Sequence, residues 1–136
     1  MARFESSGLD DLISEMQRMG QQTGPVAEEM VQAAVDIIKE KWKESAREHG
    51  HIDTGEMFDS IGYGLPVHAA NIIYQDVYPQ GKDSKGVGNA EKAFILHYGS
   101  SRIPASYWVD DAMMKADPEV EKACIAIWDR FLNGGG

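Results

Sequence analysis

The sequence is poor in several kinds of residue, and each shortage excludes a class of protein. Cys124 is the only cysteine among 136 residues, so the chain cannot form an internal disulfide or a cysteine-based metal site. Apolar runs are too short to span a bilayer, and the first residues lack the apolar segment of a signal peptide. We therefore expect a protein of a reducing cytoplasm, with Cys124 as an inert thiol in the core.

Basic residues are also scarce, and the deficit is unevenly spread. The chain has 13 Lys and Arg residues against 22 Asp and Glu residues, which gives a net charge of −9. The excess of acidic over basic side chains is absent only from residues 61–104, which carry four basic and three acidic side chains. An acidic surface disfavours tight, nonspecific binding to DNA, because phosphate binding depends on Lys and Arg. It does not exclude a protein that DNA slides past.

Catalytic motifs are missing as well. The serines lie in neither a G-x-S-x-G nor an S-x-x-K arrangement. Gly81, Gly86 and Gly88 share one loop but lack the spacing of a phosphate-binding loop. We therefore predict no catalytic residue, no cofactor and no small-molecule substrate.

One pattern, His49, His51 and Asp53, suggests metal chemistry. Alternating imidazole and carboxylate groups can bind zinc, which would make the chain a small metal-dependent hydrolase. Such a site needs further ligands, and the other two histidines, His68 and His97, have no supporting motif beside them. We interpret the pattern as a solvated helix–loop junction and predict no metal site. A cytoplasmic regulatory module that binds proteins through its long helix is a further alternative.

Apolar residues recur at helical spacing along most of the chain. The expected helices cover residues 7–19, 25–48, 55–60 and 90–98, then a segment after Pro104 and a last helix that ends near residue 132. The expected caps are Asp53 and Thr54 for the helix over 55–60, Asn89 for 90–98, and Asp117 for the last, with Pro118 at its first position. A strand is also possible over 90–98, but its first residues favour a helix. The long helix carries an acidic face that is a candidate for solvent or a lumen, formed by Glu29, Asp36, Glu40 and Glu44.

Residues 61–67 alternate with a period of two and predict a strand. The apolar and aromatic residues over 72–78 predict a second strand, with a turn over 68–71. Pro66 indicates an edge position or a bulge, because proline cannot donate to a ladder. Residues 79–89 predict a flexible loop, and residues 133–136 a frayed tail. We thus expect a single α+β domain over residues 1–136. In it, a long N-terminal helix and C-terminal helices pack on a small antiparallel sheet, a β-hairpin with a long loop.

Three short segments give the chain a resemblance to a known family. They are Thr54-Gly55-Glu56-Met57-Phe58-Asp59-Ser60-Ile61, His97-Tyr98-Gly99-Ser100 and Pro104-Ala105-Ser106-Tyr107-Trp108. In this order and spacing the chain resembles the tail-completion (minor tail) proteins of long-tailed bacteriophages, the gene-ten-like group of the Hong Kong 97 phage. His97, Ser100 and Tyr107 depart from the family, which prefers Glu, Thr and a helix-starting residue such as Pro there.

The resemblance implies a structural protein of the virion and not an enzyme. Members of the family are expected to form a ring, a hexamer, at the neck or the top of the tail tube. The ring would complete the tail and join it to the head, in contact with the head–tail connector and tail tube proteins. DNA would only pass through the lumen, no membrane would be involved, and assembly would take place in the cytoplasm of the bacterial host.

The positions that carry the resemblance, together with two lysines of the loop, are our structural and interface candidates. They are Thr54, Gly55, Phe58, Ile61, Lys82, Lys85, Tyr98, Gly99, Pro104 and Trp108.

Overall fold

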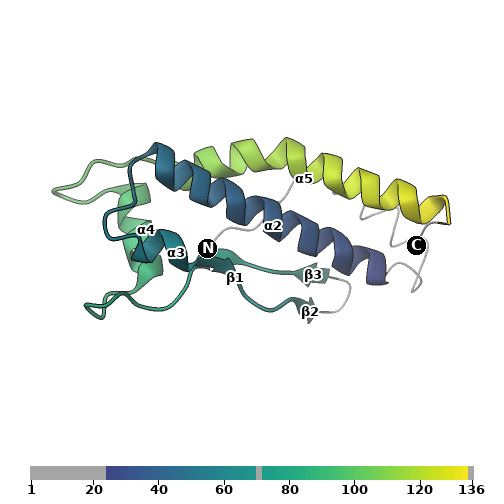
Figure 1. The fold of residues 1–136 in the computed structure, drawn as a ribbon, viewed down its shortest axis with the longest axis horizontal. Helices are drawn as coiled ribbons and strands as arrows, with labels where there is room; N and C mark the ends of the chain where they lie inside the picture. Colours follow the sequence, from purple (N-terminus) through teal and green to yellow (C-terminus); the bar gives the residue numbers. More distant parts are fainter. Residues whose placement is uncertain (1–23, 70–71, 135–136) are drawn as a thin grey trace.

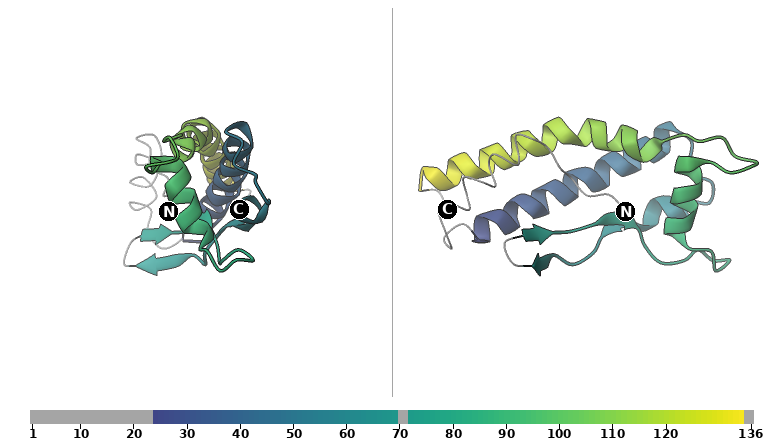
Figure 2. Two further views of the ribbon diagram at one scale, coloured as in Figure 1. Left: turned by 90° about the vertical axis from the view of Figure 1, so that its left-hand side faces the viewer. Right: turned by 180° about the vertical axis from the view of Figure 1, so that it is seen from behind.

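The computed structural model describes residues 24–69 and 72–134, and in them two long antiparallel helices lie over a layer of short strands (Figure 1). The elements are, in order, α2 (Gly24–Glu48), α3 (Glu56–Ser60), β1 (Ile61–Tyr63), β2 (Val67–Ala69), β3 (Ile72–Tyr74), β4 (Val77–Pro79), α4 (Asn89–Tyr98) and α5 (Trp108–Leu132). The α4 helix stands across one end of the long pair (Figure 2). The predicted α+β class is confirmed. The helix expected over residues 7–19 lies outside the described residues.

The core lies mainly between α2 and α5. On α5 every fourth residue is buried, and this stripe consists of Trp108, Ala112, Ala116, Val120, Cys124 and Trp128. On α2 the buried apolar residues are Val26, Met30, Ala34, Val35, Ile38, Trp42 and Ala46. Small side chains let the two helices approach, while Trp42 and Trp108 fill the space at one end with ring centroids 5.2 Å apart. Each large apolar side chain buried there contributes about 1.5 to 3 kcal/mol.

The last 25 helical residues form one helix, so the prediction of two helices separated at Asp117 is wrong. Pro118 lies inside α5, and Asp117 is no N-cap. The proline is exposed. The carbonyl group that loses its helical hydrogen bond to proline can therefore face water. Packing of the continuous buried stripe against α2 outweighs the local cost of the proline.

The predicted strand pair exists, but each strand is interrupted once. Ile61 pairs with Pro79 and Tyr63 with Val77, whereas beyond the break Val67 pairs with Tyr74. Three residues, 64–66, therefore oppose two residues, 75–76, which is a bulge. Pro66 lies in it, as expected of a residue that cannot donate to a ladder.

The expected turn over 68–71 overlaps strand β2 in the structure. Its first two residues, His68 and Ala69, belong to β2, and residues 70–71 lie outside the described residues.

Two of the predicted helix caps are wrong. Gly55, with φ of 83°, holds the N-cap position of α3, and Thr54 only accepts a long hydrogen bond of 3.4 Å from the Glu56 amide. Asn89 is the first residue of α4, not its cap, and its buried side chain donates to the Gln80 carbonyl oxygen. In both places a glycine sets the backbone direction, and the polar side chain serves another contact.

Candidate assembly surface at the α4 end

Gly99 determines how the chain leaves α4. It ends the helix with φ of 82° and ψ of 177°, a conformation open essentially to glycine alone. A Cβ atom here would lie 2.7 Å from the Ala105 amide nitrogen and 2.8 Å from the Ile103 carbonyl oxygen. Residues 99–107 therefore turn tightly and form a loop that projects from the end of the molecule (Figures 1 and 2).

The base of this loop is tied to α4 and to itself. The amide groups of Ser106 and Tyr107 donate to the Leu96 and His97 carbonyl oxygens at 3.3 and 3.0 Å. Near the tip, the Ser100 amide donates to the Ile103 carbonyl oxygen at 2.7 Å. The Ser100 hydroxyl oxygen accepts from the amide groups of residues 102 and 103. These bonds give the backbone of the loop a defined structure at its base and near its tip.

Four large apolar side chains are exposed around α4 and the loop, and we call this group the aromatic end. Its members are Phe94, Tyr98, Ile103 and Tyr107, which are 63%, 59%, 40% and 51% exposed. The Phe94 and Tyr98 rings lie 4.7 Å apart. Contiguous exposed aromatic side chains on a soluble domain are typical of protein–protein contact surfaces.

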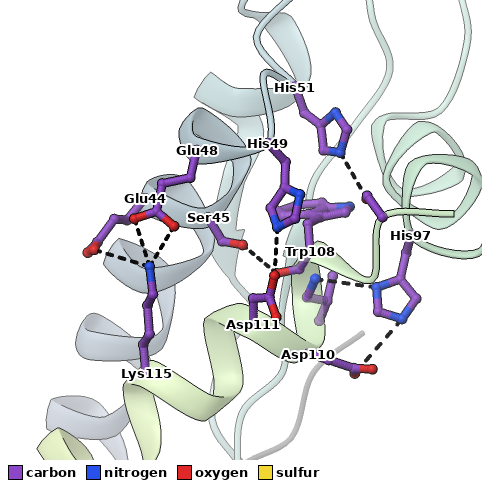
Figure 3. Close-up of polar contacts among 12 residues, drawn as sticks. Glu44, Ser45, Glu48, His49, His51, His97, Trp108, Asp110, Asp111 and Lys115 are labelled. Carbon is purple, nitrogen blue, oxygen red and sulfur yellow. Dashed lines mark hydrogen bonds and ion pairs between the residues drawn. The ribbon is translucent and has the colours of Figure 1, made fainter. Parts of the chain in front are cut away.

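His97 joins the aromatic end to the start of α5. Its buried ring lies 4.5 Å from the Tyr98 ring and 5.3 Å from the Tyr107 ring. Its Nδ1 atom accepts a hydrogen bond of 3.3 Å from the Val109 amide, and Nε2 lies 3.9 Å from an Asp110 carboxylate oxygen (Figure 3). The imidazole thus caps α5 from another element, which assigns its proton to Nε2.

Tyr107 starts α5 in an unusual conformation. It holds the N-cap position with φ of 52°, the left-handed region that few non-glycine residues adopt. No local side chain caps the helix there, so the cap comes from His97. The sequence did not predict that His97 caps α5, because His97 lies ten residues before Tyr107 and on a different helix.

Trp108 anchors the aromatic end to the core. Its side chain is fully buried, and its Nε1–H donates to the Ala93 carbonyl oxygen of α4 at 3.3 Å. Its own carbonyl oxygen accepts from the Ser45 hydroxyl on α2 (Figure 3). One residue therefore fixes α2, α4 and α5 relative to each other.

His49 and His51 do not converge on a common centre. Their rings stack 5.8 Å apart, but His49 Nε2 contacts an Asp111 carboxylate oxygen at 2.7 Å, while His51 Nε2 donates to the Ser106 hydroxyl oxygen at 3.0 Å (Figure 3). Over residues 24–69 and 72–134, no three His, Cys, Asp or Glu side chains gather as a metal site would require. The geometry favours bracing of the loop and α5 over the hydrolase alternative.

The burial of His51 affects its protonation. Its ring packs on the edge of Trp108, with centroids 5.9 Å apart. Burial disfavours the charged imidazolium and lowers the pKa of His51, and nearby His49 adds to this effect. The neutral ring keeps its proton on Nε2 for Ser106, whose hydroxyl in turn donates to the Leu96 carbonyl oxygen.

A second group of candidates lies beside the loop over residues 80–88. Glu56 of α3 accepts hydrogen bonds from the Ser84 amide at 2.9 Å and the Ser84 hydroxyl at 3.2 Å, which lower its pKa. Asp83 pairs with Lys92 and accepts from the amide groups of Lys85 and residue 87, and its pKa is lowered as well. These contacts argue for an ordered loop, whereas its flexibility stays a prediction.

The sequence-predicted candidates thus fall into two neighbouring groups. Tyr98, Gly99, Pro104 and Trp108 come together at the aromatic end, where Pro104 is exposed in the loop. The second group is made of Thr54, Gly55, Phe58 and Ile61 on and around α3, and of exposed Lys82 and Lys85 in the adjoining loop. Within it, Ile61 is a core residue, and the Phe58 ring lies 5.3 Å from the Lys43 ammonium and 5.2 Å from the Arg47 guanidinium.

The acidic face expected on the long helix is engaged within the chain at three of its four positions. Glu29 pairs with Arg130 of α5, and Asp36 accepts from the Tyr63 hydroxyl at 3.0 Å. Glu44 contacts Lys41 and Lys115. In the part of the chain that the structure describes, no helix is long and apolar enough to cross a membrane.

These features define a small α+β protein with a group of exposed aromatic and apolar side chains at one end. Residues 10–109 match the family model described as "Bacteriophage HK97-gp10, putative tail-component". The match covers most of the chain, so the protein belongs to this family of phage tail components. No significant match was found among curated proteins or among solved structures.

Proposed function

We propose that the protein is a structural subunit of the phage neck, where it forms a ring that completes the tail and joins it to the head. Membership of a phage tail-component family supports the virion as its location. The observation that carries the proposal is the aromatic end, a contiguous exposed apolar surface held by Gly99, His97 and Trp108. A surface of this kind suits assembly, because it can be buried against a partner without rearrangement.

The ring is proposed to be a hexamer whose partners are the head–tail connector and the tail tube proteins. Lys82 and Lys85 lie exposed in the loop that precedes α4 and provide a basic surface for such a partner. The acidic balance of the rest of the chain suits a protein that DNA passes without being held.

Electron microscopy of phage particles made without the protein tests this function. Filled heads and separate tails are expected in the absence of the protein, and adding purified protein to the extract should restore joined, infectious particles. Joined particles at the normal yield in its absence would exclude the joining role. Native mass spectrometry of the purified ring, or symmetry analysis of the neck density, tests the number six.

Charge reversal of the loop is a narrower test. The double variant Lys82→Glu/Lys85→Glu should fold normally, since both side chains are exposed, but should fail to restore joined particles. Lys122→Glu on the exposed surface of α5 is a matched control for the loss of positive charge. If both variants restored joined particles equally well, the two lysines of the loop would have no role in the assembly contact.

A further inference from the structure

His97 lies where both ends of the projecting loop meet. The loop leaves α4 at Gly99 and returns at Tyr107, whose amide donates to the His97 carbonyl oxygen at 3.0 Å. The His97 side chain is buried and contacts the Val109 amide of α5. One residue therefore holds the return of the loop and the start of α5 together.

The contact with α5 requires a neutral imidazole. Nδ1 of His97 accepts the Val109 amide hydrogen at a donor–acceptor distance of 3.3 Å, so this nitrogen must carry a lone pair and no proton. In the charged form both ring nitrogens carry protons, and the ring can only donate. Two N–H groups would then face each other, and the first turn of α5 would lose its cap.

The groups around the ring offer the charged form a second arrangement. Asp110 of α5 places a carboxylate oxygen 3.9 Å from Nε2, and its side chain is 70% exposed (Figure 3). The ring also contacts the phenol rings of Tyr98 on α4 and Tyr107 at the end of the loop, with centroids 4.5 and 5.3 Å away. A charged ring would therefore lose the Val109 amide and gain a closer pairing with Asp110, on the solvent side.

The other two histidines at this junction respond differently to a proton. His49 Nε2 contacts the Asp111 carboxylate at 2.7 Å, so a positive ring strengthens this pair. His51 donates from Nε2 to the Ser106 hydroxyl oxygen, and a second proton on Nδ1 leaves that bond in place. Of these three contacts, that of His97 is the one that the proton itself breaks.

We propose that His97 is a proton-controlled switch that sets the position of the loop over residues 99–107. With a neutral ring, the loop is held as the structure shows it. With a charged ring the cap is released, and Tyr107 is free to leave its left-handed conformation at φ of 52°. Trp108 stays buried and bonded to α2 and α4, so the change is confined to the loop and the first turn of α5. Because Ile103 and Tyr107 belong to the aromatic end, acidification would alter the surface that the protein offers to a partner.

An NMR titration of the full-length protein tests the switch between about pH 7.5 and about pH 5, on either side of the range in which histidine usually changes charge. The Val109 amide shift should change with the same midpoint as the His97 ring. The protection factor of this amide against hydrogen exchange should fall about tenfold, as expected for the loss of one hydrogen bond. Signals of Ile103 and Tyr107 should move with it, whereas those of Leu65, in the bulge between the strand pairs, should not.

Two variants identify the histidine that is responsible. In His97→Asn the carboxamide oxygen lies close to the position of Nδ1 and can accept from the Val109 amide, but it does not ionise. The Val109 transition should therefore disappear. His49→Gln is the matched control, because Gln can still donate to Asp111 and does not ionise either. In this control the Val109 transition should persist.

Several outcomes would overturn the switch. They are a His97 ring that stays neutral over this range, a Val109 amide that does not follow the charging of the ring, and a Val109 transition that survives in His97→Asn or is lost in His49→Gln. The first two are measured on the wild type alone, so they remain decisive if His97→Asn fails to fold.

The switch acts within one chain and does not rest on the proposed ring. Particles that join normally without this protein would reject the proposed function and leave the switch intact. A titration without the Val109 transition would reject the switch and leave the proposed function intact.

Discussion

The Ser45 hydroxyl donates a hydrogen bond of 2.5 Å to the Trp108 carbonyl oxygen, and both residues are fully buried. The bond joins the last turns of α2 to the first residue of α5. It therefore sets where α5 begins relative to α2, and with it the position of the loop and the aromatic end.

Ser45→Ala should lower the free energy of unfolding by about 1 kcal/mol, the usual contribution of a buried hydrogen bond. The Trp108 carbonyl oxygen is still part of the first turn of α5 in this variant. A larger loss of stability is therefore not expected. Urea unfolding followed by tryptophan fluorescence measures the change. Ser101→Ala, in the exposed part of the loop, is the control and should stay within about 0.5 kcal/mol of the wild type.

Gly99→Ala should destabilise the protein by about 3 kcal/mol or displace the projecting loop. The backbone conformation alone costs roughly 1 to 3 kcal/mol for a residue with a side chain. The added Cβ would also lie 2.7 Å from a backbone nitrogen. Gly81→Ala is matched, because Gly81 also has a positive φ but has open space around it, and it should cost only about 1 kcal/mol. Equal melting midpoints for the two variants would contradict the close packing at Gly99.

Pro118→Ala should stabilise the protein by about 1 to 3 kcal/mol, since proline is roughly 3 kcal/mol less favourable than alanine inside a helix. The structure places Pro118 in the middle of α5, on its exposed side. A helix that began at Asp117 would predict the opposite, a loss of stability. The melting midpoint decides between the two, with Ala126→Gly on the exposed side of the same helix as the expected destabilising reference.

The folded protein should lose stability as the pH falls below 6.5, in part through His51. Its pKa in the folded protein is lower than the ordinary value of 6.5, so the unfolded chain binds the proton first. The contribution is complete above pH 6.5 and declines as the pH falls through the folded pKa. An NMR titration of the His51 ring should give a midpoint below 6.5. His51→Gln, which can still donate to Ser106, should reduce the pH dependence of unfolding; an unchanged dependence would argue against this role.

The sequence predicted those elements whose signals are local. The apolar spacing of residues 25–48 gives α2 almost to its ends, and Gly99 ends α4 as expected. Pro66 correctly indicated the bulge, because proline lacks an amide proton and cannot donate to a strand ladder in any tertiary context. Residues 54–61, 97–100 and 104–108 also sufficed to indicate the family.

The rest depends on contacts between distant residues. Asp117 and Pro118 form a valid helix start by local rules, and only packing of α5 on α2 makes that reading wrong. The cap that His97 provides for α5 has no local pattern, since it joins two helices through a loop.

The pairing of α2 with α5 has a consequence for synthesis on the ribosome. Contacts such as Ser45 with Trp108 and Glu29 with Arg130 join residues 63 and 101 positions apart. At about 5 to 20 residues per second, α2 emerges roughly 3 to 12 s before the first turn of α5 is made. During that interval the apolar side of α2 that packs against α5 in the folded protein has not yet met this partner. Completion of the core between the two long helices must therefore wait until almost all of α5 has been synthesised.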